Sequence, residues 1–174
     1  LFKQSYQGDS KVGDFFPLLG AHTSYKENNV ILSKPNLIDI SLATHVNCDF
    51  TNQPDLVQTF VVACVLQNTT FHFSGLQSLK IKETDRIAAL IQEMRKLGYV
   101  LYEKDGTTLY WNGERCERSH EAIDTYEDHR MAMAFAPACL VMDEICINNP
   151  EVVSKSYPHY WDDLKAAGFI IEEE

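Results

Sequence analysis

The sequence predicts an α/β domain that repeats a unit of helix, hairpin, buried helix and strand. Three observations favour this fold class. One apolar helical stripe occurs three times and ends each time on a glycine. Turn-rich hairpin patterns follow two of these glycines, and two further helices are apolar almost all round. We therefore expect helices buried inside surrounding sheets.

The three striped helices are the first element of each unit. They run from Val12 to Gly20, from Leu90 to Gly98 and from Tyr160 to Gly168, with apolar residues eight, four and one positions before the glycine. This spacing places the apolar side chains on one helix face. A glycine after the last turn adopts the left-handed C′ conformation at little cost. Pro17 lies inside the first helix and is tolerated there if that helix starts late.

Two hairpins are predicted after the first two glycines. The first pairs residues 21–25 with 30–32, and the second pairs residues 99–102 with 107–111. In both, turn-forming residues separate runs of β type. After the third glycine only Phe169-Ile170-Ile171 and a short acidic end remain.

Two buried helices begin at Asp55 and Asp128, and each precedes a short predicted strand. The strands are residues 70–73 and 144–147, which lie 74 positions apart. Because both helices are apolar nearly all round, neither has a face suited to water. Pro137 falls inside the second helix and is unexpected there.

These elements predict a single domain over residues 1–174. Two complete units span about residues 8–82 and 83–155, and a third begins at residue 156. The chain opens at Leu1 rather than at methionine and shows no signal-peptide pattern. We therefore expect it to be a piece of a longer gene product.

Composition narrows the functional classes. With 15 Lys and Arg against 25 Asp and Glu, the formal charge is -10, which disfavours general nucleic-acid and membrane-surface binding. No apolar run approaches bilayer length. No C-x-x-C pair is present to hold zinc, so a reducing, cytoplasmic setting is expected. The cysteines are Cys48, Cys64, Cys116, Cys139 and Cys146.

Polar clusters recur at the predicted helix starts. They are Lys82–Arg86, Asp128–Arg130 and Lys155 with Ser156, and Asp55 opens a further helix. Helix N-termini attract anions through free N–H groups and the helix dipole, and nearby Lys or Arg strengthens the attraction. If the units surround a pseudo-threefold axis, these starts converge on one side of the domain.

Structural interpretations compete at each position. Asp55, Asp85 and Asp128 are good helix caps, and capping alone explains each of them more readily than catalysis. The 82–86 segment also fits a solvated charge run, and a single histidine such as His129 is more often structural than catalytic. Recurrence at successive helix starts favours function, because a surface charge run has no reason to recur there. No residue spacing fits a metal site.

Four segments together resemble the 5-enolpyruvylshikimate-3-phosphate synthase family, the 3-phosphoshikimate 1-carboxyvinyltransferases. The resemblance covers essentially the whole chain, in order. Its most specific parts are K-E-T-D-R and D-H-R-M-A-M. The segments are Gly75-Leu76, Ile81–Ile87, Thr125–Met133 and Ser154–Pro158.

The resemblance implies a fold and a reaction. Family members have two domains, each of three βαβαββ units, and this chain resembles part of the later domain. The family transfers the enolpyruvyl group of phosphoenolpyruvate to the 5-hydroxyl of shikimate 3-phosphate, in the shikimate pathway to aromatic amino acids, without metal or cofactor. Glyphosate competes at its phosphoenolpyruvate site. The missing first domain supplies most of the shikimate-phosphate pocket, so we expect this chain to be inactive without that partner.

The motifs also imply residue roles. Asp55 resembles the proton acceptor at the shikimate hydroxyls, Glu83 its acid/base partner, and Lys82 a group near the transferring hydroxyl. Ser78 stands where many relatives have an asparagine on the shikimate side. Residues that resemble phosphoenolpyruvate ligands are Arg86, His129, Arg130 and Lys155.

Departures from the family pattern are small. Glu127 replaces the usual Asn, and Ser156-Tyr157 replaces Thr-Phe. The cations beside Glu83 favour its ionised form, which suits a base better than an acid. Which carboxylate donates and which accepts stays open.

The sequence leaves other functions open. The chain fits a non-catalytic anion-binding fragment that holds phosphate through its arginines and lysine. Within the enzymes, a related UDP-sugar enolpyruvyl transferase and the RNA 3′-phosphate cyclase share the fold. K-E-T-D-R together with D-H-R-M-A-M argues against both enzymes.

Overall fold

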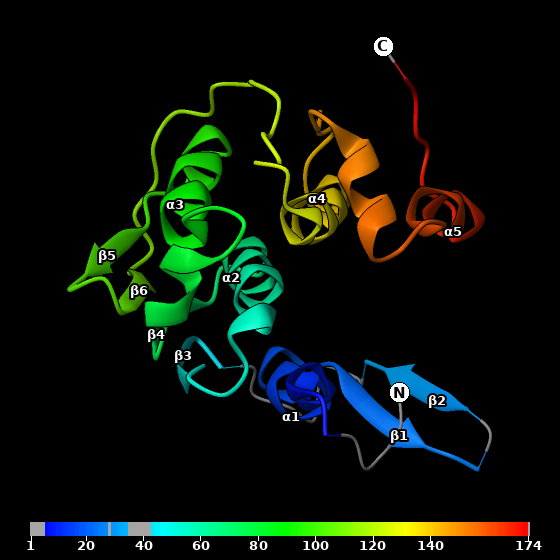
Figure 1. The fold of residues 1–174 in the computed structure, drawn as a ribbon, viewed down its shortest axis with the longest axis horizontal. Coiled ribbons are helices and arrows are strands. Elements are labelled where there is room, and N and C mark those ends of the chain that lie inside the picture. The colour runs from blue at the N-terminus through cyan, green and yellow to red at the C-terminus, as the bar shows by residue number, and fades with distance from the viewer. Residues whose placement is uncertain (1–5, 28, 35–42, 174) are drawn as a thin grey trace.

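The structure is a computed structural model that describes residues 6–27, 29–34 and 43–173. Figure 1 shows that helices and strands are interspersed along the chain. The α-helices are α1 (Val12–Phe15), α2 (Val57–Leu66), α3 (Arg86–Lys96), α4 (His129–Phe135) and α5 (Tyr160–Ala166). The 3₁₀ turns are η1 (Gly8–Lys11), η2 (Phe16–Leu19), η3 (Pro54–Leu56), η4 (Gln77–Ile81), η5 (Ala136–Leu140) and η6 (Pro150–Lys155). The strands are β1 (His22–Tyr25), β2 (Val30–Ser33), β3 (His45–Asp49), β4 (Thr70–Ser74), β5 (Tyr102–Lys104) and β6 (Thr108–Trp111).

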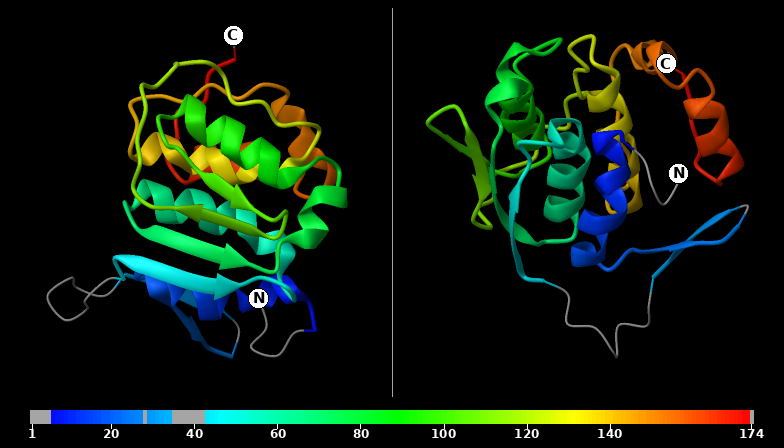
Figure 2. Two further views of the ribbon diagram at one scale, coloured as in Figure 1. Left: turned by 90° about the vertical axis from the view of Figure 1, so that its left-hand side faces the viewer. Right: turned by 60° about the horizontal axis from the view of Figure 1, so that its bottom comes forward.

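A four-stranded sheet of order β3-β4-β6-β5 forms one layer. Strands β3 and β4 run parallel, and the other neighbours are antiparallel. Helices α2 and α3 lie behind this sheet, and α1 and α4 lie alongside α2 (Figure 2). The β1–β2 hairpin forms a separate two-stranded sheet. The fold class is therefore mixed α/β, as predicted.

The hydrophobic core lies between the sheet and α2. Phe50, Phe60 and Phe73 have no exposed surface. The Phe50 and Phe73 rings lie 5.0 Å apart between centroids, and Phe15 of α1 stacks on Phe50 at 4.9 Å. Helix α2 is buried on nearly all sides, which explains why its sequence lacks a polar face. The expectation of a buried helix after Asp55 is confirmed.

The three glycine-terminated helices are present. Gly20, Gly98 and Gly168 follow η2, α3 and α5 with φ of 85°, 92° and 101°, all left-handed. At Pro17 the α-helix has already changed to the 3₁₀ turn η2, because proline has no N–H for the α-helical bond. Pro137 marks the same change at η5, so the second buried helix ends as an α-helix at Phe135.

Two strand predictions were wrong in detail. Strand β5 covers Tyr102–Lys104 rather than residues 99–102, because Asp105 and Gly106 both have positive φ and confine the turn there. The predicted strand at residues 144–147 is only a single parallel bridge between Ile123 and Ile147. Asn149, at φ 50°, is the N-cap of η6, which starts at Pro150 and leaves no room for a longer ladder.

One strand was missed. The β3 strand alternates a buried Val46 and a half-buried Cys48 with exposed neighbours. Its partner, β4, lies more than twenty residues further along the chain. Because the partner strand is distant in sequence, the residues of β3 show little beyond an alternation of buried and exposed side chains that would predict the pairing.

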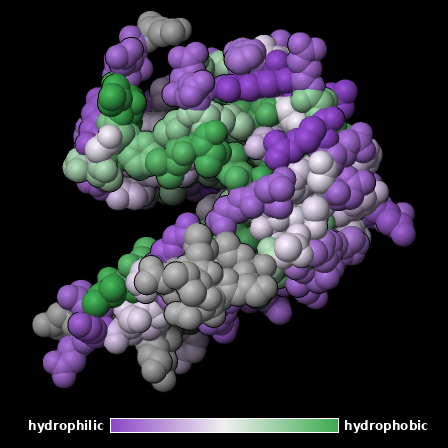
Figure 3. Space-filling model, turned by 180° about the vertical axis from the view of Figure 1, so that it is seen from behind, coloured by the Kyte–Doolittle hydropathy of each residue, from purple (hydrophilic) through white to green (hydrophobic). Residues whose placement is uncertain are grey.

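A smaller apolar cluster joins α4, η6 and α5. It buries Ala132, Val153 and Tyr160, and the Tyr160 hydroxyl donates to the Met133 carbonyl at 3.0 Å. Figure 3 shows apolar surface on the face opposite Figure 1, bordered by hydrophilic residues. Within the described parts of the chain, none of the helices combines the length and apolar character needed to cross a bilayer.

Candidate active site

Aspartates cap the two helices that bear the charged motifs. The Asp85 carboxylate accepts the backbone N–H groups of Ile87 and Ala88 at 3.1 and 3.0 Å. The Asp128 carboxylate accepts the Arg130 N–H at 2.9 Å. The capping interpretation therefore holds for both. It does not hold for Asp55, which lies in η3 and makes no capping bond.

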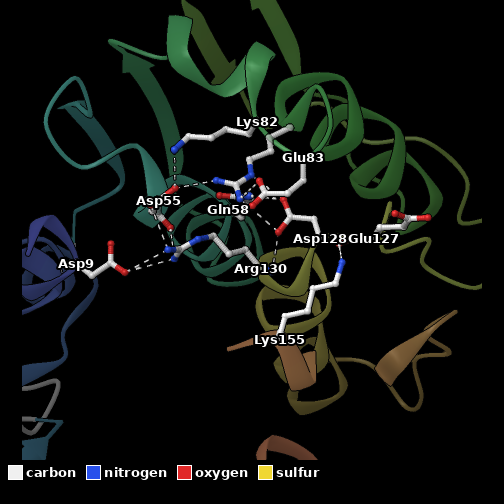
Figure 4. A network of polar contacts seen from close by, with 10 residues as sticks. Asp9, Asp55, Gln58, Lys82, Glu83, Glu127, Asp128, Arg130 and Lys155 are labelled. Carbon is white, nitrogen blue, oxygen red and sulfur yellow. Dashed lines mark hydrogen bonds and ion pairs between the residues drawn. The ribbon is translucent and has the colours of Figure 1, made fainter. Parts of the chain in front are cut away.

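Arg86 is the centre of the charged cluster. Its side chain is 1% exposed and contacts the carboxylates of Asp55, Glu83 and Asp128, which Figure 4 labels. Nε donates to Asp128 Oδ2 at 2.6 Å, Nη1 to Asp55 Oδ1 at 2.8 Å, and Nη2 to Glu83 Oε2 at 2.7 Å. A buried guanidinium needs such partners, because an unpaired charge in the interior is very costly.

Asp55 faces three cations from two segments, residues 82–86 and the start of α4. Besides the Arg86 contact, its carboxylate lies 3.2 Å from Arg130 Nη2 and 3.6 Å from Lys82 Nζ. Burial alone would raise the pKa of Asp55, but Arg130, Arg86 and Lys82 together outweigh it and lower the pKa. Asp55 is therefore ionised at neutral pH and can accept a proton.

The Glu83 side chain is more exposed than that of Asp55, and nearby cations stabilise its ionised form as well. A hydrogen bond from its own backbone N–H lowers the pKa of Glu83, and the nearby Arg86, His129 and Lys82 charges add to this effect against the opposing effect of burial. The expectation that cations favour its ionised form is confirmed. His129, the first residue of α4, is half-buried and close enough to affect Glu83 electrostatically.

Arg130 bridges α4, η3 and the N-terminal turn η1. Its guanidinium donates to the Asp55 carbonyl at 3.2 Å and, through both Nη atoms, to one oxygen of Asp9 at 3.4 Å. The Arg130 side chain is 26% exposed, so its donors remain partly open to water. These are long contacts for charged groups, which usually approach more closely.

Lys155 and Ser78 lie at the edge of the cluster. The Lys155 ammonium donates to the Glu127 carbonyl at 3.0 Å, directly before Asp128 (Figure 4). Ser78 lies in η4, which ends just before Lys82, and its side chain makes no hydrogen bond within the described residues. The structure thus brings the predicted charged residues together and leaves Ser78 outside their contacts.

Three participants were not among the predicted site residues. Asp128 has no exposed surface and pairs with Arg86 as well as capping α4. Gln58 is fully buried, donates weakly to Asp128 at 3.5 Å and leaves its Oε1 without a partner. Asp9 contacts Arg130 from 121 residues away. Only Asp128 had a sequence signal, since it opens a charged motif.

The site holds cations and carboxylates in nearly equal number. Such an arrangement can bind phosphate or carboxylate groups through arginine and lysine while keeping a carboxylate ready to take a proton. No group of three or more His, Cys, Asp or Glu side chains with metal-binding geometry occurs among residues 6–27, 29–34 and 43–173. All five cysteines are free thiols.

Comparison with known proteins matches residues 1–164 to the family described as EPSP synthase (3-phosphoshikimate 1-carboxyvinyltransferase). A 3-phosphoshikimate 1-carboxyvinyltransferase of Bacteroides fragilis is 54% identical over 173 residues, which are 99% of this chain and 41% of the relative. The enzyme of the same name from Aliivibrio fischeri is 35% identical over 164 residues, 94% of this chain and 36% of its own length. This chain therefore spans about two fifths of the length of these relatives. The family match and the identity to these relatives place the chain in the EPSP synthase family.

Proposed function

We propose that this chain supplies part of an active site that transfers the enolpyruvyl group of phosphoenolpyruvate to the 5-hydroxyl of shikimate 3-phosphate. The supporting observation is the meeting of one carboxylate, Asp55, with Lys82 and Arg86 of one segment and Arg130 of another. The reaction needs this combination. A base must take the hydroxyl proton while cations hold a phosphate and a carboxylate.

Phosphoenolpyruvate binds at the cationic side of the cluster. Arg130 and Lys155 are the accessible donors, because Arg130 is partly exposed and Lys155, exposed on the surface, donates to a backbone carbonyl rather than to a carboxylate among the described residues. Arg86 already contacts three carboxylates, so it binds substrate only when one of them moves away. His129 contributes as a neighbour of the same helix start.

Asp55 accepts the proton of the attacking hydroxyl. Its pKa is low because cations surround it. When the substrate's anionic groups bind these cations, they offset the positive charge, so the pKa of Asp55 rises and it becomes a stronger base. Lys82, whose ammonium lies 3.6 Å from the Asp55 carboxylate and is partly exposed, orients the hydroxyl, and in this proposal Ser78 contacts shikimate 3-phosphate.

The hydroxyl oxygen then bonds to C2 of phosphoenolpyruvate, and the methylene carbon gains a proton. Loss of that proton and of phosphate from the tetrahedral adduct restores the double bond. Glu83 donates the proton that the methylene carbon gains and takes a proton back from that carbon when phosphate leaves. Its ionised state in the free site means that it must first acquire a proton to act as the acid.

The rest of the pocket comes from the first domain of the same enzyme. In this proposal the chain is one domain of βαβαββ units at about residues 8–82, 83–155 and 156–174, and the enzyme is cytoplasmic. Recurring left-handed glycines after the striped helices support the unit boundaries.

Complementation tests this function. Phosphate release from phosphoenolpyruvate and shikimate 3-phosphate is measured for the chain alone and with the unmatched part of the Bacteroides fragilis relative added. Release only in the mixture is the expected result. No release in a mixture that forms a complex would contradict catalysis and favour the anion-binding alternative.

A further inference from the structure

The segment before α4 has an unusual backbone. Tyr126 and Glu127 are adjacent and have φ of 54° and 55°. This left-handed conformation is disfavoured for residues with a Cβ atom, and asparagine tolerates it better than tyrosine or glutamate. Two such residues in succession persist only where surrounding contacts hold them.

A buried carboxylate on α3 provides one such contact. Glu93 has no exposed surface and lies seven residues after Arg86, on the same helix face. Its Oε1 accepts the Tyr126 hydroxyl at 2.6 Å, and its Oε2 accepts the Asp124 N–H at 3.0 Å. Lys96 neutralises Glu93 at 2.8 Å and also donates to the Ala122 carbonyl.

The other end of the segment is fixed at the site. Asp128 pairs with Arg86, so residues 124–128 are attached to α3 at both ends. Between these ends, the Glu127 carbonyl accepts the Lys155 ammonium at 3.0 Å. The orientation of that carbonyl depends on the left-handed backbone.

We propose that Tyr126 is a positioning residue whose hydroxyl, bound to the buried Glu93, holds the left-handed Tyr126–Glu127 backbone and thereby places Arg130 and Lys155. This role rests on the proposed function in one respect, that these two cations bind the anionic substrate. Tyr126 itself contacts no substrate.

The hydroxyl suits this task. Burial, and then the adjacent Glu93, raise the pKa of Tyr126, so the hydroxyl keeps its proton and remains a donor at neutral pH. Without that donor, one Glu93 oxygen is left buried and unpaired, and the strained backbone is free to relax. Relaxation turns the Glu127 carbonyl away from Lys155.

Hydrogen exchange on the full chain tests the proposal without any ligand. The reporter amides belong to Asp128 and Arg130, and the reference amide is that of Tyr99, which follows α3 and donates to the Met94 carbonyl. Tyr126→Phe is compared with Tyr126→Phe/Glu127→Asn, in which asparagine relieves the left-handed strain. Tyr102→Phe is the matched control, because Tyr102 also donates to a carboxylate but on the exposed sheet.

Tyr126→Phe should lower protection at the two reporter amides about five- to tenfold more than at Tyr99. The double variant should recover most of this loss, and Tyr102→Phe should leave the reporters unchanged. A uniform loss at all amides, or no recovery in the double variant, would overturn the proposal.

Inorganic phosphate titration separates this proposal from the function on which it rests. If the unaltered chain binds phosphate, Tyr126→Phe should weaken its affinity for phosphate severalfold, and the double variant Tyr126→Phe/Glu127→Asn should regain it. An unchanged affinity in Tyr126→Phe would refute the positioning role. If the unaltered chain binds none, the proposed anion site fails. Hydrogen exchange still decides the role of Tyr126 in that case.

Discussion

Replacing Asp128 by asparagine tests the buried ion pair at the centre of the site. Asp128 has no exposed surface and accepts Arg86 Nε at 2.6 Å. Removing one member of a buried pair costs about 3–5 kcal/mol when the other is left unpaired. Asp55 and Glu83 remain on Arg86, so we expect a loss of about 2–4 kcal/mol in the free energy of unfolding.

The capping role of Asp128 is separable from its charge. Asparagine caps a helix nearly as well as aspartate, whereas alanine does not, so Asp128→Ala should cost about 1 kcal/mol more than Asp128→Asn. Asp85 is the control, because it caps α3 without pairing with Arg86. Asp85→Asn should cost less than about 1 kcal/mol.

Urea unfolding at neutral pH measures the unaltered chain and the three variants under one condition. If Asp128→Asn is as stable as Asp85→Asn, the pair with Arg86 contributes nothing beyond the cap. Equal losses for Asp128→Asn and Asp128→Ala would refute the capping contribution.

Asp9→Asn should strengthen phosphate binding about two- to fivefold, because Asp9 competes for Arg130 as a half-exposed ion pair. Asp14→Asn is the control by isothermal titration, since Asp14 pairs with Lys11 and with no cation of the site among the described residues, and weaker binding in Asp9→Asn would refute the competition. The pKa of Asp124 is lowered chiefly by its hydrogen bond from Lys96. Asp124 therefore stabilises the folded chain fully above its unfolded pKa of 3.8, and this stabilisation is lost as pH falls through the lower pKa of the folded state. Urea unfolding between about pH 5 and pH 2 should therefore show a smaller acid loss in Asp124→Asn than in the unaltered chain, and equal losses would contradict this assignment.

Local patterns predicted the helices well. The stripes ending at Gly20, Gly98 and Gly168 combine a period of 3.6 with a residue that tolerates positive φ, and both are properties of short segments. Strand β3 was missed because its parallel pairing with β4 depends on chain far away. The strand predicted at residues 144–147 is a single bridge at Ile147 for the same reason, because residues with high β propensity form a strand where a partner strand lies beside them.

The site residues were likewise predicted where a local motif marks them and missed where they enter through contacts distant in sequence. Spacing at helix starts identified Asp55, Arg86 and Arg130, and the structure brings them together. Asp9 contacts Arg130 across 121 positions, and Gln58 contacts Asp128 across 70. Neither residue carries a motif of its own, so only the folded chain reveals them.

Turnover of an Asp55→Asn variant in the complementation mixture tests the central claim most directly. Asparagine keeps the shape of Asp55 but cannot accept the hydroxyl proton, so phosphate release should fall by about a hundredfold or more. Asp143→Asn, at an exposed position, is the control and should keep full turnover. Undiminished phosphate release by Asp55→Asn would contradict the account and remove this cluster from the chemistry.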